Sequence, residues 1–134
     1  MQRDICGNKI HILGAVVKNN DNAAIFYNIE DKVSSHRCRF TIAHELAHCC
    51  LAHDSGDVYI DYRTDGETLN EEEQAANAFA GELLIPEQVL RTTINGLVLP
   101  SVKSLWDIFD VSENVMRARL EYLRIQDRIL GYNY

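Results

Sequence analysis

Residues His44 to His48 form the motif HELAH, an example of HExxH, within a segment of helical periodicity. Two histidines four residues apart lie on one face of a helix, so both imidazoles can reach one tetrahedral cation at about 2.0–2.1 Å. The glutamate between them lies roughly 100° around the helix, where it can reach a water molecule on that cation. Apolar residues flank the motif, and burying three ionisable groups without a purpose is unfavourable. The motif therefore predicts that His44 and His48 bind a metal ion and that Glu45 is a general base.

A third ligand is needed, because a catalytic zinc ion has three protein ligands and leaves its fourth position to water. In the HExxHxxGxxH class this ligand follows on the same segment, but here Leu51 replaces the glycine and Asp54 replaces the last histidine. That class is disfavoured, although the Asp54 carboxylate has the chemistry of a ligand. The alternative takes a glutamate from a second helix, with a polar residue one turn later that hydrogen-bonds a ligand histidine. Glu73 and Asn77 have this spacing.

The apolar pattern of this second helix supports the choice of Glu73. The stripe that begins with Glu73 and Asn77 continues with Ala80 and Leu84, which are apolar. The neighbouring Glu71 and Glu72 project elsewhere. Glu73 also has an ordinary interpretation, because acidic residues are common in the first turn of a helix.

The elements that position these residues follow from residue type and periodicity. The segments 9–17 and 23–29 are rich in β-branched and aromatic residues and predict a β-hairpin around the polar turn KNNDN. A helix capped by Ser34 or Ser35 is expected to run to about Ala52, and 58–62 alternates as a short strand. Four further helices are expected, namely 71–84 capped by Asn70, 86–96, 101–109, and one that is capped by Ser112 and carries Val115, Met116, Leu120, Leu123 and Ile129. A few strands followed by helices indicate an α+β fold.

The 134 residues suit a single domain, with a hairpin region (1–32), a part with the metal-binding helices (33–86) and a helical C-terminal part (87–134). The last part has large apolar residues at core spacing, which are interpreted as core or as the lining of a groove for the substrate: Trp106, Phe109, Met116 and Leu120. No apolar run is long enough for a membrane span, and residues 1–10 lack the pattern of a secretory signal. Four cysteines without CxxC spacing suggest reduced thiols. A cytoplasmic protein is expected.

The net charge of -7 makes nucleic acid and anionic membranes unsuitable partners. Between Asp54 and Glu73 there are eight acidic residues and one basic residue, so this stretch accounts for the whole of the net charge. The remainder holds twelve residues of each sign. Although 111–120 superficially suggests a DNA-reading helix, its arginines are offset by acids.

Two blocks of the sequence resemble the ImmA/IrrE family of metallo-endopeptidases. They are FTIAHELAH at 40–48 and EQAANAFAGELLIP at 73–86, and the family has similar blocks in the same order and spacing. The resemblance extends more loosely to the hairpin, to 109–112 and to 119–120. It implies a zincin-like core in which a small antiparallel sheet packs on the HExxH helix. It also implies Zn²⁺ bound by His44, His48 and Glu73, with Glu45 as the base.

The chemistry expected of this site is hydrolysis of a peptide bond. Strand 58–62 is expected to hold the substrate by edge pairing. Zincins usually place a phenol, imidazole or guanidinium opposite the metal, which makes candidates of Tyr59, Tyr62, His53 and Arg63. His11 and His36 have no partners at ligand spacing and are interpreted as ordinary histidines.

Two functions remain open. The resemblance implies a site-specific endopeptidase that cuts a regulatory protein, such as a helix-turn-helix repressor of a mobile element or stress pathway. The acidic stretch is expected to border the cleft and to favour a basic segment of that substrate. The alternative is a non-catalytic regulator whose metal only holds the helices together. The presence of Glu45 favours the enzyme, because a structural zinc ion needs no base.

Overall fold

The computed structural model describes residues 10–18, 22–27, 35–51, 58–64 and 70–133; the side chains of 10–13 and 58–64 lie outside this description. The chain divides into two compact units, residues 1–80 and 81–134, and the boundary falls inside a helix. The first unit contains the sheet and the HExxH helix, and the second is helical. This order confirms the predicted α+β class with a helical C-terminal part.

The first unit is built on a three-stranded antiparallel sheet with the order β2-β1-β3. Strand β1 (Ile10–Lys18) pairs with β2 (Ala23–Tyr27) as the predicted hairpin, and with β3 (Val58–Thr64) on its other side. Strand β3 is two residues longer than predicted. The pairing of β1 with β3 has an irregularity between Ile12 and Gly14, where one residue of β1 is left over, as in a β-bulge.

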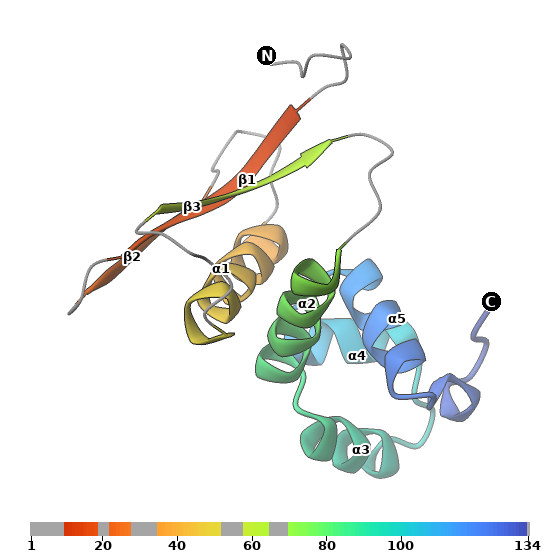
Figure 1. The fold of residues 1–134 in the computed structure, drawn as a ribbon. Coiled ribbons are helices and arrows are strands. Elements are labelled where there is room, and N and C mark those ends of the chain that lie inside the picture. The colour runs from red at the N-terminus through yellow and green to blue at the C-terminus, as the bar shows by residue number, and fades with distance from the viewer. Residues whose placement is uncertain (1–9, 19–21, 28–34, 52–57, 65–69, 134) are drawn as a thin grey trace. The chain divides into compact units, whose positions relative to one another are not determined.

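Helix α1 (Ser35–Leu51) packs against β1 and β2, as Figure 1 shows, which confirms the predicted small sheet on the HExxH helix. The buried residues of α1 come at helical spacing, with Ala43 and Ala47 as apolar members. Alanines at these positions let the helix lie close to its neighbours. Val16 of β1 is buried as well, so this side of the sheet belongs to the interior of the unit.

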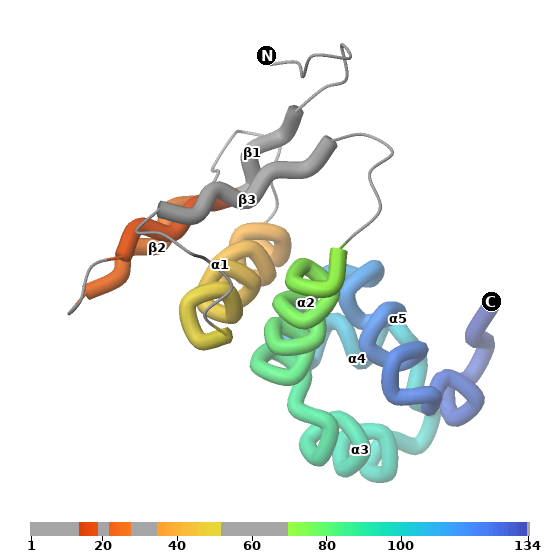
Figure 2. The backbone as a smooth tube through the Cα atoms, viewed as in Figure 1, coloured from red at the N-terminus to blue at the C-terminus, as the bar shows by residue number. Residues whose placement is uncertain are grey.

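Helix α2 (Glu71–Leu84) contains the boundary between the units, after Ala80. The backbone passes through Ile85 and Pro86 into α3 (Glu87–Gly96), a connection that Figure 2 traces. Helix α3 begins one residue after the predicted start, because Pro86 is its N-cap: the φ of -58° at Pro86 suits a helix start, but its ψ of 133° is still extended.

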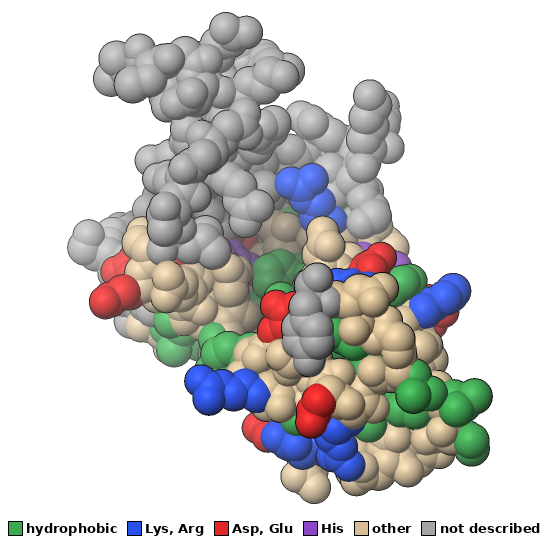
Figure 3. Space-filling view, turned by 90° about the vertical axis from the view of Figure 1, so that its right-hand side faces the viewer, with side chains coloured by type: hydrophobic (Ala, Val, Ile, Leu, Met, Phe, Trp, Pro, Cys, Tyr) green, Lys and Arg blue, Asp and Glu red, His purple; other side chains and the backbone are tan. Residues whose placement is uncertain are grey.

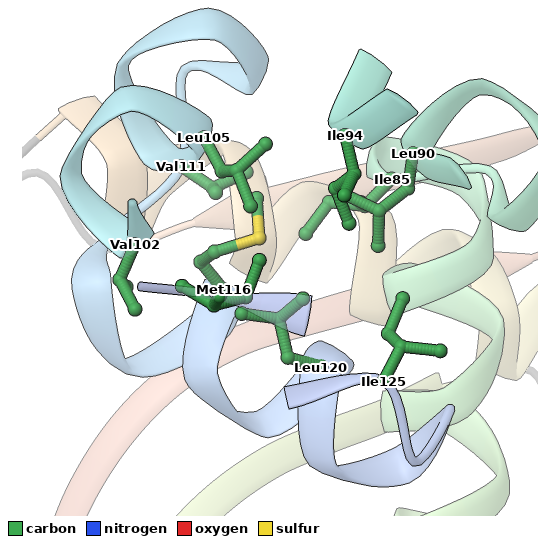
Figure 4. Packing of buried hydrophobic residues seen from close by; sticks show 10 residues of the cluster. Ile85, Leu90, Ile94, Val102, Leu105, Val111, Met116, Leu120 and Ile125 are labelled. Carbon is green, nitrogen blue, oxygen red and sulfur yellow. The ribbon is translucent and has the colours of Figure 1, made fainter. Parts of the chain in front are cut away.

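Helices α4 (Val102–Phe109) and α5 (Glu113–Tyr122) pack against each other and complete the second unit. Ser112 caps α5, as predicted, whereas Ser101, predicted as the first residue of its helix, is the N-cap of α4; both side chains accept a hydrogen bond from a backbone N–H group of the first turn. The core gathers side chains from α3, α4, α5 and the loops (Figure 4), and its fully buried members include Ile85, Leu90, Leu105, Met116 and Leu120. Trp106 and Phe109 pack against it, so the core interpretation of these residues is confirmed.

The prediction that Ile129 continues the last helix is wrong. Helix α5 ends at Tyr122 because Arg124 adopts the left-handed conformation, with φ of 55°. The N–H of Ile125 then donates to the carbonyl of Leu120, which closes the helix end. Ile129 still enters the core, but it follows a short 3₁₀ turn (Gln126–Arg128).

A buried arginine of α5 binds the segment at the end of α2, where the second unit begins. Arg119 of α5 is 5% exposed, and its Nε donates to the carbonyl of Ile85 at 3.1 Å, just beyond the end of α2. Its guanidinium also pairs with Glu82. Burial lowers the pKa of Arg119, and Tyr122 acts in the opposite direction. Arginine is nevertheless charged at neutral pH, so its two partners satisfy a buried cation.

We expect Arg119→Met to lower the free energy of unfolding by about 2 kcal/mol, because it removes charge-assisted hydrogen bonds from a buried site. Urea denaturation followed by circular dichroism measures this change. The matched control is Lys103→Met, which removes an exposed ion pair with Asp107 on α4 and should cost far less. Equal effects of the two substitutions would contradict the role given to Arg119.

No helix in the described part of the chain is long and apolar enough to cross a membrane. On the face shown in Figure 3, Lys and Arg side chains lie beside Asp and Glu side chains instead of forming a separate basic patch. Within the described residues, Arg91 forms an ion pair with Glu87 and Arg117 with Glu113.

Candidate metal centre

Helix α1 brings the two motif histidines to one buried face. His44 is 5% exposed and His48 is 1% exposed, and their rings lie edge to face with centroids 4.7 Å apart. The i and i+4 spacing produces this arrangement, because positions four apart overlie each other on a helix. The Nε2 atoms of the two rings are 3.1 Å apart. The structure therefore brings the two predicted histidines together, with both Nε2 atoms close enough to bind one ion.

Glu73 enters the same cluster from the first turn of α2. Asn70 caps this helix, as predicted, since its Oδ1 accepts a hydrogen bond from the backbone N–H of Glu73 at 2.8 Å. The cap orients the first turn. Glu71 and Glu72 are exposed, whereas Glu73 is partly buried. Sequence reasoning distinguished these three acids by their helical stripe, and their burial agrees with that distinction.

The carboxylate of Glu73 contacts both imidazoles. Its Oε2 lies 2.9 Å from Nε2 of His44, and its Oε1 lies 3.1 Å from Nε2 of His48. Within the described residues, these are the three side chains that could hold a metal ion as a group. All three belong to the first unit.

The separations of these atoms fit a tetrahedral ion. Ligand atoms that each lie about 2.0–2.1 Å from a zinc ion are about 3.3 Å from one another. The two imidazole Nε2 atoms are 3.1 Å apart and Oε2 of Glu73 is 2.9 Å from Nε2 of His44, only a few tenths of an ångström shorter, while the 3.1 Å contact to Nε2 of His48 is made by the other oxygen, Oε1. Two imidazole nitrogens and a carboxylate oxygen are also a donor set that zinc accepts, with one position left open. The residues present fit the ion.

Glu45 is completely buried, with 0% of its surface exposed. It lies on α1 next to His44, on a side of the helix that faces β1. A carboxylate in such surroundings has little contact with bulk water. Sequence reasoning identified this residue as a base but missed the strand that covers it.

The structure says less about the other predicted site residues. Asn77 is partly buried one turn after Glu73, and its hydrogen bond to a ligand histidine stays a prediction. Tyr59 and Tyr62 pair in register with Val16 and Ile12, but their side chains and that of Arg63 lie outside the described residues. The same applies to all of His53 and Asp54 and to the loop residues of the acidic stretch.

The sheet, the HExxH helix and the cluster of two histidines and a glutamate agree with the predicted zincin-like α+β fold. The family model of Peptidase_M78, described as the IrrE N-terminal-like domain, matches residues 14–121, and the chain belongs to this family. The matched range includes α1, the first turn of α2 and almost all of α5. No curated protein matches the sequence significantly.

Proposed function

We propose that the protein is a zinc-dependent endopeptidase that hydrolyses a peptide bond in a regulatory protein. The observation that carries this proposal is the buried Glu45 beside a cluster of three metal-ligating side chains. Membership of a peptidase family supports the same reaction. A site that only stabilised the fold would be expected to have a fourth protein ligand and no need of a base.

The residues have distinct tasks in this reaction. His44, His48 and Glu73 would hold Zn²⁺, which supplies Lewis acidity that polarises the scissile carbonyl and makes a water molecule more acidic. The Glu45 carboxylate would accept the proton of the attacking water and pass it to the leaving amine. Because Glu45 is buried, it is shielded from bulk water.

Metal removal and metal return test the proposal directly. The purified protein is depleted with a chelator, reloaded with one equivalent of zinc and incubated with flexible peptides and repressor proteins. Cleavage should disappear on depletion and return on reloading, as followed by mass spectrometry of the products. Cleavage that persists without metal would contradict a zinc peptidase, and so would a fully loaded protein that cuts none of these substrates.

We further propose that the substrate is a helix-turn-helix repressor with a basic segment near the cleaved bond. The support for this choice is the concentration of acidic residues between positions 54 and 73, which includes the ligand Glu73. Opposite charges near a binding site raise the rate of encounter. This preference concerns substrate recognition and does not alter the proposed chemistry.

Raising the salt concentration is expected to weaken cleavage of a basic substrate. Between about 50 and 500 mM salt, kcat/KM should fall several-fold for a peptide with flanking arginines, because salt screens exposed charges. The control is the same peptide with glutamines in place of the arginines, measured over the same salt range. If both peptides respond equally, the acidic stretch does not select the substrate.

A further inference from the structure

Strand β1 lies against Glu45 at a glycine. A methyl group placed on the Cα of Gly14 would be 3.0 Å from Cγ of Glu45 and 3.0 Å from its Oε1. It would also be 3.0 Å from the backbone carbonyl oxygen of Phe26 on β2. Real Cβ atoms rarely make contacts this short, so a larger residue at position 14 requires something to move.

The atoms that an added methyl group would approach, on Glu45 and on the backbone of Phe26, differ in how easily they can move. The carbonyl of Phe26 is part of the strand pairing, in which Gly14 is opposite Tyr27 and Ala15 is opposite Phe26. The Glu45 side chain has rotatable bonds and can adopt another rotamer. A side chain at position 14 would therefore act mainly by displacing the Glu45 carboxylate.

The local backbone of β1 is adapted to this close approach. Gly14 lies at the irregularity of the pairing between β1 and β3, and α1 packs on β1 and β2 (Figure 1). An isolated glycine in a strand is typical of a bulge or of a close approach by another group, and both occur here. Since Glu45 is fully buried, the backbone at Gly14 forms part of the wall that encloses its carboxylate.

We infer that Gly14 is a positioning residue for Glu45: its missing side chain leaves the space that the carboxylate needs in order to point at the reacting water. This inference rests on the proposed function, because it assumes that Glu45 is the base. Gly14 itself has no group that touches the substrate or moves a proton. Its role is to fix one wall of the space in which Glu45 acts.

The substitution Gly14→Ala tests the inference in the zinc-loaded protein. We expect kcat to fall about 10- to 100-fold, because misplacing a catalytic group by about 1 Å has an effect of this size. KM and zinc affinity should stay within about three-fold, because the substrate contacts and ligands are unchanged. The matched control is Gly96→Ala at the end of α3, where an added methyl group meets nothing within 4 Å. An unchanged kcat in Gly14→Ala, or an equal fall in the control, would overturn the inference.

A second measurement works without metal and without cleavage. Melting temperatures of the metal-free protein are compared for the wild type, Gly14→Ala, Glu45→Ala and the double variant, as a double-mutant cycle. If the methyl group added by Gly14→Ala presses on Glu45, the loss of stability caused by this substitution is smaller once the glutamate side chain is gone. If Gly14→Ala alone does not fold, recovery of folding in the double variant supports the contact. Equal losses in both backgrounds, or failure of both variants to fold, would overturn it.

The two tests separate the inference from the proposed function. If the wild type cleaves nothing when loaded with zinc, the proposed function fails, while the cycle still decides whether Gly14 and Glu45 are in contact. If the wild type cleaves and the cycle shows no coupling, the proposed function stands and the role of Gly14 fails.

Discussion

Glu45→Gln is expected to lower kcat by about 10²- to 10⁴-fold while the protein still binds one zinc ion. General bases contribute factors of this size, and glutamine cannot accept a proton from water at neutral pH. The change keeps the volume of a side chain that is 0% exposed, so it creates no cavity in the interior. The ligands His44, His48 and Glu73 are untouched.

The measurement combines kcat from single-turnover cleavage with zinc content from elemental analysis of the same sample. Glu72→Gln is the matched control, because it makes the same chemical change on an exposed residue of α2. We expect the control to cleave as the wild type does. Undiminished cleavage by Glu45→Gln would exclude Glu45 as the base, and loss of zinc from that variant would mean that Glu45 helps to hold the metal.

Glu73→Gln is expected to weaken zinc binding by more than about 100-fold. Replacing groups that only support a ligand costs about 10- to 100-fold in metal affinity, and a ligand itself should cost more. The substitution removes the anionic member of a cluster whose other two members are imidazoles. Competition with a chromogenic chelator measures the affinity, and Glu71→Gln on the exposed side of α2 is the control.

This experiment also decides between the two ligand sets considered from the sequence. Asp54→Asn should leave zinc binding within a few-fold of the wild type if Glu73 completes the site. The opposite pattern, with zinc lost in Asp54→Asn and retained in Glu73→Gln, would make Asp54 the third ligand. Loss in both variants would mean that the two carboxylates share the metal.

Much of the centre could be predicted because its geometry is local. The 3.6-residue period of a helix fixes the relation of His44 to His48, so the five-residue motif supplies two of the three ligands and the proposed base. Glu73 is distant in sequence, but the cap at Asn70 and the apolar stripe beyond Asn77 gave its helix a start and an inward face. The structure brings the Glu73 carboxylate within 3.1 Å of both imidazoles.

The predictions were weaker where distant segments determine the conformation. The contact of Gly14 with Glu45 joins a strand to a helix, and the only local signal was a glycine inside a run of β-branched residues. In the sequence Arg119 is one of several arginines on an amphipathic helix, and nothing local indicated that it would be buried with its Nε donating to the carbonyl of Ile85. The apolar spacing predicted that the last helix reaches Ile129, but that spacing contains no sign of the left-handed conformation at Arg124, which ends α5.

The hydrogen bond between Asn70 and the N–H of Glu73 links the start of α2 to whatever the Glu73 carboxylate binds. Helices fray from their ends, and Glu73 lies in the first turn of α2. An ion bound to Glu73 would therefore oppose fraying of the N-terminal end of this helix. Any ligand that binds only the folded form adds RT ln(1 + [L]/Kd) to stability, about 2.7 kcal/mol at a hundred times Kd. The backbone amides of Glu73 and Gln74, which both donate to Asn70, would consequently report metal occupancy, exchanging their hydrogens slowly in the loaded protein and quickly after chelation.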